Sequence, residues 1–360
     1  MKTSLVTLLF LAVSRTIASA FGDSVVESQD SVGFGVNTED LADFTKFAQY
    51  AGAAYCNPVA GRPVYCKGDI CPAGNYSNAT IYSVFHGIET DVLGFIAVDS
   101  TAQEIIISLR GSSSLSNWLG DVVWARQPTT MCRNCWAHLG FLFAYAEVVK
   151  NVNATLFSAT KLFPNYKISL TGHSLGAAVG TLLAMRLRDM GYEMDAYLYG
   201  SPRVGNEALA SYISHQKGGS NYRVTHLADL VARLPPINRE FRHISPEYWM
   251  QPGPSWRTRY DAAEIEVCTG YANAACNAGA PWWVLDITSH LYYFVAISHC
   301  GETEPRLRFA NEPVNGTTAV NGSEAGLDQT TANALAMYAK LDQDYANALQ
   351  TSGIESDMVF

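Results

Sequence analysis

The chain has 360 residues, of which 48% are hydrophobic and only 16% are charged, and its formal net charge is −9. Disordered chains have few apolar and many charged residues, so the composition excludes disorder for the bulk of the chain. The acidic balance argues against a nucleic-acid partner, because such proteins present basic surfaces to the phosphates. The length predicts one large domain with appended segments, or two smaller domains.

The N-terminus has the pattern of a secretory signal peptide. Lys2 precedes an apolar run from Leu5 to Val13, and Ala18-Ser19-Ala20 is a small-residue cleavage site. The run is too short to span a bilayer. We therefore predict a signal peptide over residues 1–20 and a secreted, extracellular product.

All eight cysteines follow this segment, and in an oxidising compartment they should form disulfides. The Cys132–Cys135 spacing resembles half of a zinc site, but no second pair follows at suitable spacing, so we expect no metal. The number of possible pairings leaves the connectivity open. Short loops favour Cys66–Cys71, Cys132–Cys135 and Cys268–Cys276, which would leave Cys56 and Cys300 to join the two ends of a domain.

Glycosylation signals also fit secretion. Five Asn-X-Ser/Thr sequons are candidate glycan sites, at Asn75, Asn78, Asn153, Asn315 and Asn321.

Residues 21–40 are polar and are predicted to form a mobile leader or pro-segment. Residues 41–300 are predicted to form the main domain, with a first helix beginning near Thr38. In this domain, strand-like and helix-like runs alternate, which indicates an α/β sheet with helices on its faces. The predicted strands are Ile81–Phe85, Gly94–Asp99, Glu104–Leu109, Lys167–Thr171, Asp195–Tyr199 and Tyr222–His226, and the helices are Phe141–Asn151, Leu175–Met190 and Asn206–Gln216.

The composition changes after Cys300. Residues 301–325 contain prolines and Asn-Gly pairs typical of a linker, and the segment 301–360 is predicted as a linker and a C-terminal helix. That helix, from about residue 328 to 350, carries an apolar stripe of Ala334, Tyr338, Leu341, Tyr345 and Ala348.

The strongest chemical signal is Gly172-His173-Ser174-Leu175-Gly176. A strand precedes this motif and an apolar helix follows it, which is the setting of a nucleophile elbow. The tight turn would project the serine oxygen beyond the sheet, and the helix N-terminus would offer free N–H groups to an oxyanion.

A serine nucleophile needs a histidine base and an orienting acid. Elbow hydrolases carry them downstream in the order serine, acid, histidine. Asp229 follows a predicted strand, where a loop acid is expected. His215 and His226 have few acids between them and Ser174, and a Cys300 disulfide would restrain His299. His243 and His290 remain as bases that the residues alone do not separate.

From about residue 42 to 300 the chain resembles the fungal class 3 lipases of the Rhizomucor and Thermomyces type, which are related to feruloyl esterase A. The resemblance rests on nine stretches: Phe47–Cys56, Leu109–Ser112, Asn117–Gly120, Gly172–Gly176, Tyr199–Asn206, Val224–Asp229, Leu234–Pro236, Ser245–Trp249 and Asp286–Phe294. It implies the α/β-hydrolase fold, a mostly parallel central sheet flanked by helices, with a helical lid and, here, a C-terminal tail helix.

The resemblance also implies residue roles. Ser174 would be the nucleophile, Asp229 the acid and His290 the base, with Ser112 and Leu175 forming the oxyanion hole. It supports Cys56–Cys300, Cys66–Cys71 and Cys132–Cys135, and the Cys268–Cys276 bridge resembles one in related feruloyl esterases.

A short apolar segment follows Ser112. On a helix its apolar side chains would share one face, and by resemblance this lid covers the site in water and opens onto lipid. These side chains are Leu115, Trp118, Leu119, Val122 and Val123. The related feruloyl esterases carry a polar segment here.

The sequence therefore predicts a secreted triacylglycerol lipase, a serine esterase of lipid degradation that needs no cofactor and whose partner is lipid at an interface. The alternatives are a phospholipase, a mono- or diacylglycerol lipase or a feruloyl esterase with the same triad. An inactive lipase-like protein that binds lipid or a partner is a further alternative of another class.

Overall fold

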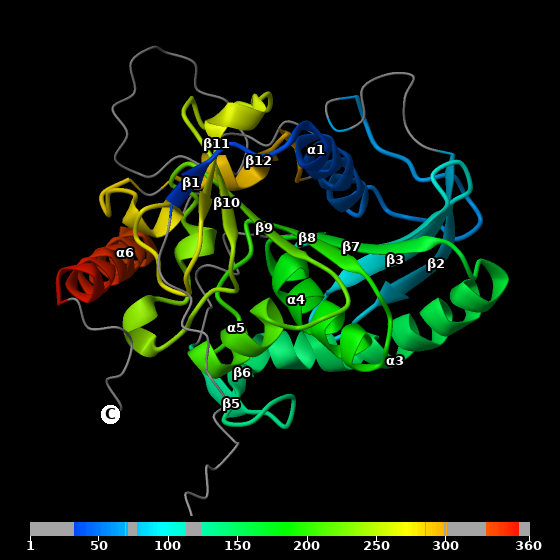
Figure 1. Ribbon diagram of the computed structural model, residues 1–360, viewed down its shortest axis with the longest axis horizontal. Coiled ribbons are helices and arrows are strands. Elements are labelled where there is room, and N and C mark those ends of the chain that lie inside the picture. The colour runs from blue at the N-terminus through cyan, green and yellow to red at the C-terminus, as the bar shows by residue number, and fades with distance from the viewer. Residues whose placement is uncertain are drawn as a thin grey trace, which may run out of the picture.

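The computed structural model describes residues 32–68, 70, 78–112, 124–284, 286–298, 300 and 329–352 (Figure 1). Nine strands of this part form one twisted sheet in the order β1-β11-β10-β9-β8-β7-β4-β3-β2. The pairs from β10 to β4 are parallel, whereas the pairs at both edges are antiparallel. The strands are β1 (Val32–Phe34), β2 (Ala79–His86), β3 (Leu93–Asp99), β4 (Glu104–Leu109), β7 (Lys167–His173), β8 (Asp195–Tyr199), β9 (Asn221–His226), β10 (Glu247–Met250) and β11 (Ile265–Cys268).

Helices cover both faces of the sheet (Figure 1). Helix α1 (Thr38–Ala53) packs on one face, and α3 (Leu139–Leu162), α4 (Leu175–Asp189) and α5 (Glu207–Ser214) lie on the other. Helix α6 (Gln329–Ser352) lies at one end of the molecule. The remaining elements are short: strands β5 (Arg126–Pro128), β6 (Trp136–His138), β12 (Tyr292–Tyr293) and β13 (Val295–Ala296), and the 3-10 turns η1 (Val231–Arg233), η2 (Ile237–Arg239), η3 (Ala262–Glu264), η4 (Asn277–Gly279) and η5 (Thr288–Leu291).

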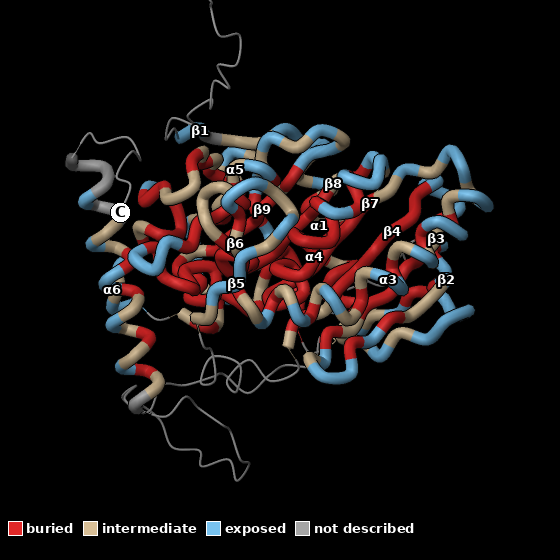
Figure 2. Tube along the Cα trace, turned by 90° about the horizontal axis from the view of Figure 1, so that it is seen from below, coloured by how far each residue is buried: buried red, intermediate tan, exposed pale blue. Residues whose placement is uncertain are grey.

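The central strands are apolar because both of their faces are covered. All six residues of β4 are buried, including the run Ile105–Ile107. A parallel strand between two helical layers is expected to lose the polar–apolar alternation of a half-exposed strand. Burying each isoleucine contributes about 2 kcal/mol. The buried residues accordingly run along the central strands and α4 (Figure 2).

The predicted α/β alternation is confirmed. The structure contains each of the six predicted strands, with bounds that differ by no more than two residues at either end. Helix α3 is longer than the predicted Phe141–Asn151: its second half buries Val152, Leu156 and Ala159 at steps of four and three residues, an apolar spacing that the prediction overlooked.

The sheet begins inside the segment that the sequence assigned to a leader. Val32–Phe34 pair with β11 as β1, and α1 begins at Thr38. Strands β10 and β11 were also not predicted. Such short strands owe their structure to pairing rather than to a strong local pattern. Residues 1–31, with the predicted signal peptide, lie outside the described part of the chain.

The tail helix is present, and its predicted apolar stripe is partly right, because Tyr338 and Tyr345 are half-buried and pack against core clusters. Its buried residues are Ala332, Leu335, Ala339 and Asp342, whereas Leu341 is 38% exposed. The helix is therefore rotated relative to the prediction, and an aspartate takes a place on its inner face. A pattern search that counts only apolar residues does not detect such a face.

The disulfides join Cys56 to Cys300, Cys132 to Cys135 and Cys268 to Cys276. Cys66 is also disulfide-bonded, and Cys71 lies outside the described residues. The Cys56–Cys300 bond connects the end of α1 to the end of the main domain. Within the described ranges, none of the helices combines the length and the apolar character needed to cross a bilayer.

Candidate active site

Ser174 occupies a strained turn between β7 and α4. Its φ of 58° and ψ of −127° place a non-glycine residue at positive φ, which costs free energy and is characteristic of functional turns. The Ser174 N–H donates to the carbonyl of Tyr199 at 3.0 Å, so the turn is tied to the end of β8. A Cβ at Gly176 would lie 2.5 Å from the carbonyl oxygen of Leu109, which explains the glycine that follows the serine.

Asp229 and His290 form a buried pair beyond the ends of the parallel strands. Asp229 follows β9 and His290 lies in η5, and Nδ1 of His290 donates to Oδ2 of Asp229 at 2.8 Å. Their side chains are 0% and 1% exposed. The N–H of Val231 donates to the other carboxylate oxygen at 2.8 Å. With Nδ1 donating to the carboxylate, Nε2 is left as the proton-accepting atom of the neutral ring.

His290 is held beside the turn that carries Ser174. Nε2 of His173 donates to the backbone carbonyl of His290 at 2.8 Å, and the two imidazole rings are 4.5 Å apart. Nε2 of His290 is buried and bonds to no protein atom of the described ranges. It is therefore available to a hydroxyl proton.

Tyr293 adds another donor to the carboxylate. Its hydroxyl donates to Oδ2 of Asp229, and burial, followed by the charge of Asp229, raises the pKa of Tyr293 well above its ordinary value. Tyr293 therefore stays protonated. It lies in the Asp286–Phe294 stretch, but the sequence does not indicate that its hydroxyl reaches Asp229.

The positions predicted for the oxyanion hole flank Ser174. Leu175 is the first residue of α4, and the first N–H groups of a helix have no acceptor within the helix. Ser112 follows β4 after Gly111, and a Cβ at Gly111 would lie only 2.7 Å from Cβ of Ser174. The loop at 110–112 thus runs directly against the serine.

Two other candidate histidines have structural partners. Nε2 of His243 donates to the carbonyl of Ala232 at 2.6 Å, and burial, followed by nearby arginines, holds the pKa of His243 well below its usual value. His226 bonds to the carbonyl of Ser289 at 3.0 Å and to the hydroxyl of Tyr260 at 2.7 Å. The structure thus separates His290 from His243, which the residues alone left equivalent. His299 lies outside the described residues.

Several further predictions fall on residues that are not described. These are the lid residues Leu115, Trp118, Leu119, Val122 and Val123 and the sequons Asn75, Asn315 and Asn321. Asn78 is exposed, whereas Asn153 lies on α3 with a buried Oδ1.

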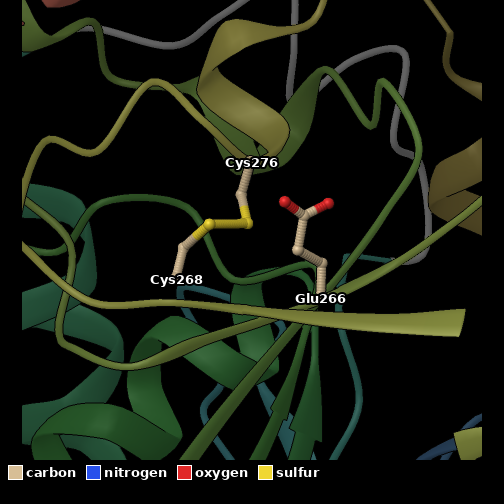
Figure 3. A group of neighbouring side chains, drawn as sticks. All are labelled: Glu266, Cys268 and Cys276. Carbon is tan, nitrogen blue, oxygen red and sulfur yellow. A yellow bond between two sulfur atoms is a disulfide. The ribbon is translucent and has the colours of Figure 1, made fainter. Parts of the chain in front are cut away.

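A metal-like cluster lies elsewhere, at Glu266, Cys268 and Cys276 (Figure 3). Its two sulfurs are joined in a disulfide, so neither is a thiolate that could bind a metal. Glu266 accepts a hydrogen bond from Gln251. The cluster is therefore explained by protein contacts alone.

The whole arrangement can support acyl transfer. A serine on a strained elbow, a histidine oriented by a buried carboxylate and a helix N-terminus are the groups that a covalent serine hydrolase uses. Sequence reasoning missed three supporting residues: Tyr293, His173 and Tyr55, whose hydroxyl lies 2.8 Å from Nδ1 of His173. Their contacts join segments that are far apart in the sequence.

Known proteins match this chain over most of its length. The family model described as "Lipase (class 3)" matches residues 106–239. The "Secreted mono- and diacylglycerol lipase 1" of Fusarium solani is 38% identical over 301 residues, which cover 81% of this chain and 89% of the relative. The "Lipase" of Rhizomucor miehei is 28% identical, over 77% of this chain and 75% of the relative.

A solved structure agrees. The crystal structure of a mono- and diacylglycerol lipase from Aspergillus oryzae superimposes with a TM-score of 0.69 at 35% sequence identity. It covers 73% of this chain and 100% of that one. This likeness confirms the expected α/β-hydrolase architecture.

Proposed function

Because the chain belongs to the class 3 lipase family, a family of carboxylic ester hydrolases, we propose that it is a secreted lipase that hydrolyses mono- and diacylglycerols with Ser174, His290 and Asp229. The observation that carries the catalytic part is the buried Asp229–His290 pair, in which Nε2 of His290 has no hydrogen-bond partner among the described residues.

The substrate part differs from the expectation of a triacylglycerol lipase. The 38% identical relative is named for mono- and diacylglycerols, whereas the 28% identical Rhizomucor lipase carries no glyceride class in its name. These relatives favour the alternative reading over triacylglycerol.

The proposed reaction has two halves. Oγ of Ser174 attacks the ester carbonyl carbon while Nε2 of His290 takes its proton, and the N–H groups of Leu175 and Ser112 stabilise the oxyanion. The C–O bond to the glyceride then breaks, and His290 returns the proton to the leaving alcohol. In the second half, His290 activates a water that attacks the acyl-serine and releases the fatty acid. Asp229 holds His290 in the tautomer with Nδ1 protonated.

Secretion is part of the proposal. It is supported by the signal-peptide pattern of residues 1–20 and by relatives that are named as secreted. The lipid surface would be met transiently, through the apolar residues of the predicted lid.

A substrate panel tests the proposal. Rates are compared on mono-, di- and trioleoylglycerol in the same mixed micelles, with phosphatidylcholine and a feruloyl methyl ester alongside and Ser174→Ala as the background control. We expect mono- and dioleoylglycerol to be cleaved about tenfold or more faster than trioleoylglycerol. A triolein rate that equals the diolein rate would overturn the substrate assignment. Full activity in Ser174→Ala would overturn the mechanism.

A further inference from the structure

The inner face of the C-terminal helix carries a buried carboxylate. Leu335, Ala339 and Asp342 of α6 are spaced by four and three residues and are at most 2% exposed. A carboxylate removed from water needs an opposite charge and hydrogen-bond donors. The groups that satisfy Asp342 therefore show what the helix is built to hold.

Arg203 is the main partner of Asp342. Its two terminal nitrogens donate to the two oxygens of the carboxylate at 2.9 and 2.8 Å, and the guanidinium is 1% exposed. The backbone N–H of Ile237 donates to Asp342 as well. Arg203 belongs to the Tyr199–Asn206 stretch that marks the family resemblance, whereas Asp342 lies on the tail.

The same guanidinium holds the segment that begins with the catalytic acid. One nitrogen of Arg203 also donates to the carbonyls of Arg233 and Pro235, at 2.6 and 2.9 Å. The backbone N–H of Arg203 donates to the backbone carbonyl of Leu234 at 2.7 Å. We call residues 229–237 the acid loop. Arg203 and Ile237 thus connect Asp342 to the second half of the acid loop.

The carboxylate also balances buried positive charge beneath the acid loop. Two neighbouring arginines have carboxylates from the main domain, with Arg223 paired to Glu247 and Arg242 to Glu207. Arg203, in contrast, pairs with Asp342, a carboxylate from α6. Arg233 is fully buried, and burial lowers its pKa to about 10, an effect that the charge of Asp342 opposes.

Apolar contacts of α6 reach both catalytic loops. Leu335 and Ala339 belong to one buried cluster with residues that follow Asp229 or lie on either side of His290: Leu230, Val231, Leu234, Ile287 and Leu291. Tyr338 packs edge-on against Trp124, the residue after the predicted lid, with ring centroids 5.7 Å apart. Helix α6 lies at this end of the molecule beside η2 and η4 (Figure 1).

We propose that Asp342 is a positioning residue for catalysis: from α6 it holds the acid loop through Arg203 and Ile237 and so sets the alignment of Asp229 with His290. The inference rests on the proposed function of the triad. The C-terminal helix is then part of the active-site scaffold. Loss of the carboxylate leaves Arg203 buried without a counter-charge, and the acid loop shifts to relieve it.

The test compares Asp342→Asn with Asp344→Asn in the full chain. Asp344 is on the same helix but is exposed and pairs with Lys340, so its substitution removes an equal charge away from the acid loop. The readouts are kcat and KM on a soluble short-chain ester, together with the melting temperature from circular dichroism. We expect Asp342→Asn to lower kcat by about 10- to 100-fold with KM changed less than about threefold, and Asp344→Asn to leave both unchanged.

A second variant separates positioning from general stability. Met337→Gly weakens α6 from its exposed face but keeps the carboxylate, so it should lower the melting temperature and retain kcat within about threefold. A kcat loss in Met337→Gly as large as that in Asp342→Asn would overturn the proposal, and so would a folded Asp342→Asn with normal kcat. If Asp342→Asn does not fold, the same criteria apply to the double variant Arg203→Met/Asp342→Leu, which removes the link without leaving a buried charge unpaired.

The outcomes for the two proposals are distinct. A wild-type protein that cleaves no acyl ester contradicts the proposed function. An active wild type whose folded Asp342 variant is equally active contradicts the positioning role alone.

Discussion

The hydroxyl of Tyr55 lies 2.8 Å from Nδ1 of His173, the residue immediately before Ser174. Nε2 of His173 faces the carbonyl of His290, which can only accept, so Nε2 carries the proton and Nδ1 accepts from the tyrosine. The Tyr55 oxygen in turn accepts from the N–H of Gly111 at 2.8 Å. A line of hydrogen bonds therefore joins the loop of Ser112 to the backbone of His290.

Substituting Tyr55→Phe should break this line. The N–H of Gly111 and Nδ1 of His173 would lose a partner in a buried site, which costs about 1–3 kcal/mol of unfolding free energy. We expect kcat on a soluble ester to fall about tenfold with little change in KM, because both the oxyanion loop and His290 lose a support. Tyr65→Phe is the control, since Tyr65 is 61% exposed. Equal kcat in the two variants would contradict the supporting role.

The hydrogen bond from Tyr293 to Asp229 leads to a second prediction. Tyr293→Phe removes one donor from a buried carboxylate, and bonds to charged groups contribute about 1.5–3 kcal/mol. We expect kcat to fall roughly 5- to 50-fold, because the carboxylate that orients His290 is held less firmly. Steady-state kinetics on a soluble ester measure the effect. The neighbouring Tyr292→Phe is the matched control, since adjacent strand residues point to opposite sides. Similar losses in both would show that the hydroxyl on Asp229 is not responsible.

The buried His243 should make stability depend on pH. Its folded-state pKa lies well below the usual value, so the unfolded chain takes up a proton below about pH 6.5 that the folded protein does not. The free energy of unfolding should therefore fall as the pH is lowered from 7 to 5, and His243 should account for about 2 kcal/mol of that fall.

Urea unfolding at both pH values measures this contribution. His243→Gln, which keeps a donor for Ala232, should reduce the difference between pH 7 and pH 5 by about 2 kcal/mol. The exposed His215→Gln should leave the difference unchanged. If the difference in unfolding free energy between pH 7 and pH 5 is the same in His243→Gln as in the wild type, His243 does not titrate differently in the folded and unfolded protein.

The long disulfide should stabilise the protein more than the short ones. Cys56 and Cys300 are 244 residues apart, whereas Cys132 and Cys135 are 3 apart. A bond that closes a longer loop removes more entropy from the unfolded chain, about 5 kcal/mol for the first and about 2 kcal/mol for the second. The double variants Cys56→Ser/Cys300→Ser and Cys132→Ser/Cys135→Ser should differ accordingly in denaturant midpoint. The reverse order would rule out loop closure as the main source of stability.

The elements of the main domain could be predicted because their signals are local. β4 reads as an unbroken apolar run, and Gly172–Gly176 sits between a strand and a helix. Each signal depends on neighbours within a few residues, so tertiary contacts strengthen it without changing it. β1 has no such signal, because its three residues form a strand only through pairing with β11.

The candidate site was predictable only as a set of residues. Ser174 is marked by its turn, but spacing and chain order left His243 and His290 equivalent, and only the family resemblance favoured His290. The fold separates them, because the loop after β9 brings Asp229 to His290 whereas His243 faces Ala232. The Asp229–His290 contact joins residues 61 positions apart, a separation over which no helix or strand periodicity extends.

The sequence by itself determined the α/β order of elements, the elbow at Ser174 and the small group of acids and bases that could serve it, because each depends on local pattern and residue chemistry. The tertiary structure decided what spacing and chain order left open, namely which histidine meets Asp229, and it turned α6 so that Asp342 is buried while Leu341 of the predicted stripe is exposed. The reason in both cases is the cost of burial. A charged group inside the protein must find its partner wherever the fold places one, and for Arg203 that partner is 139 residues away.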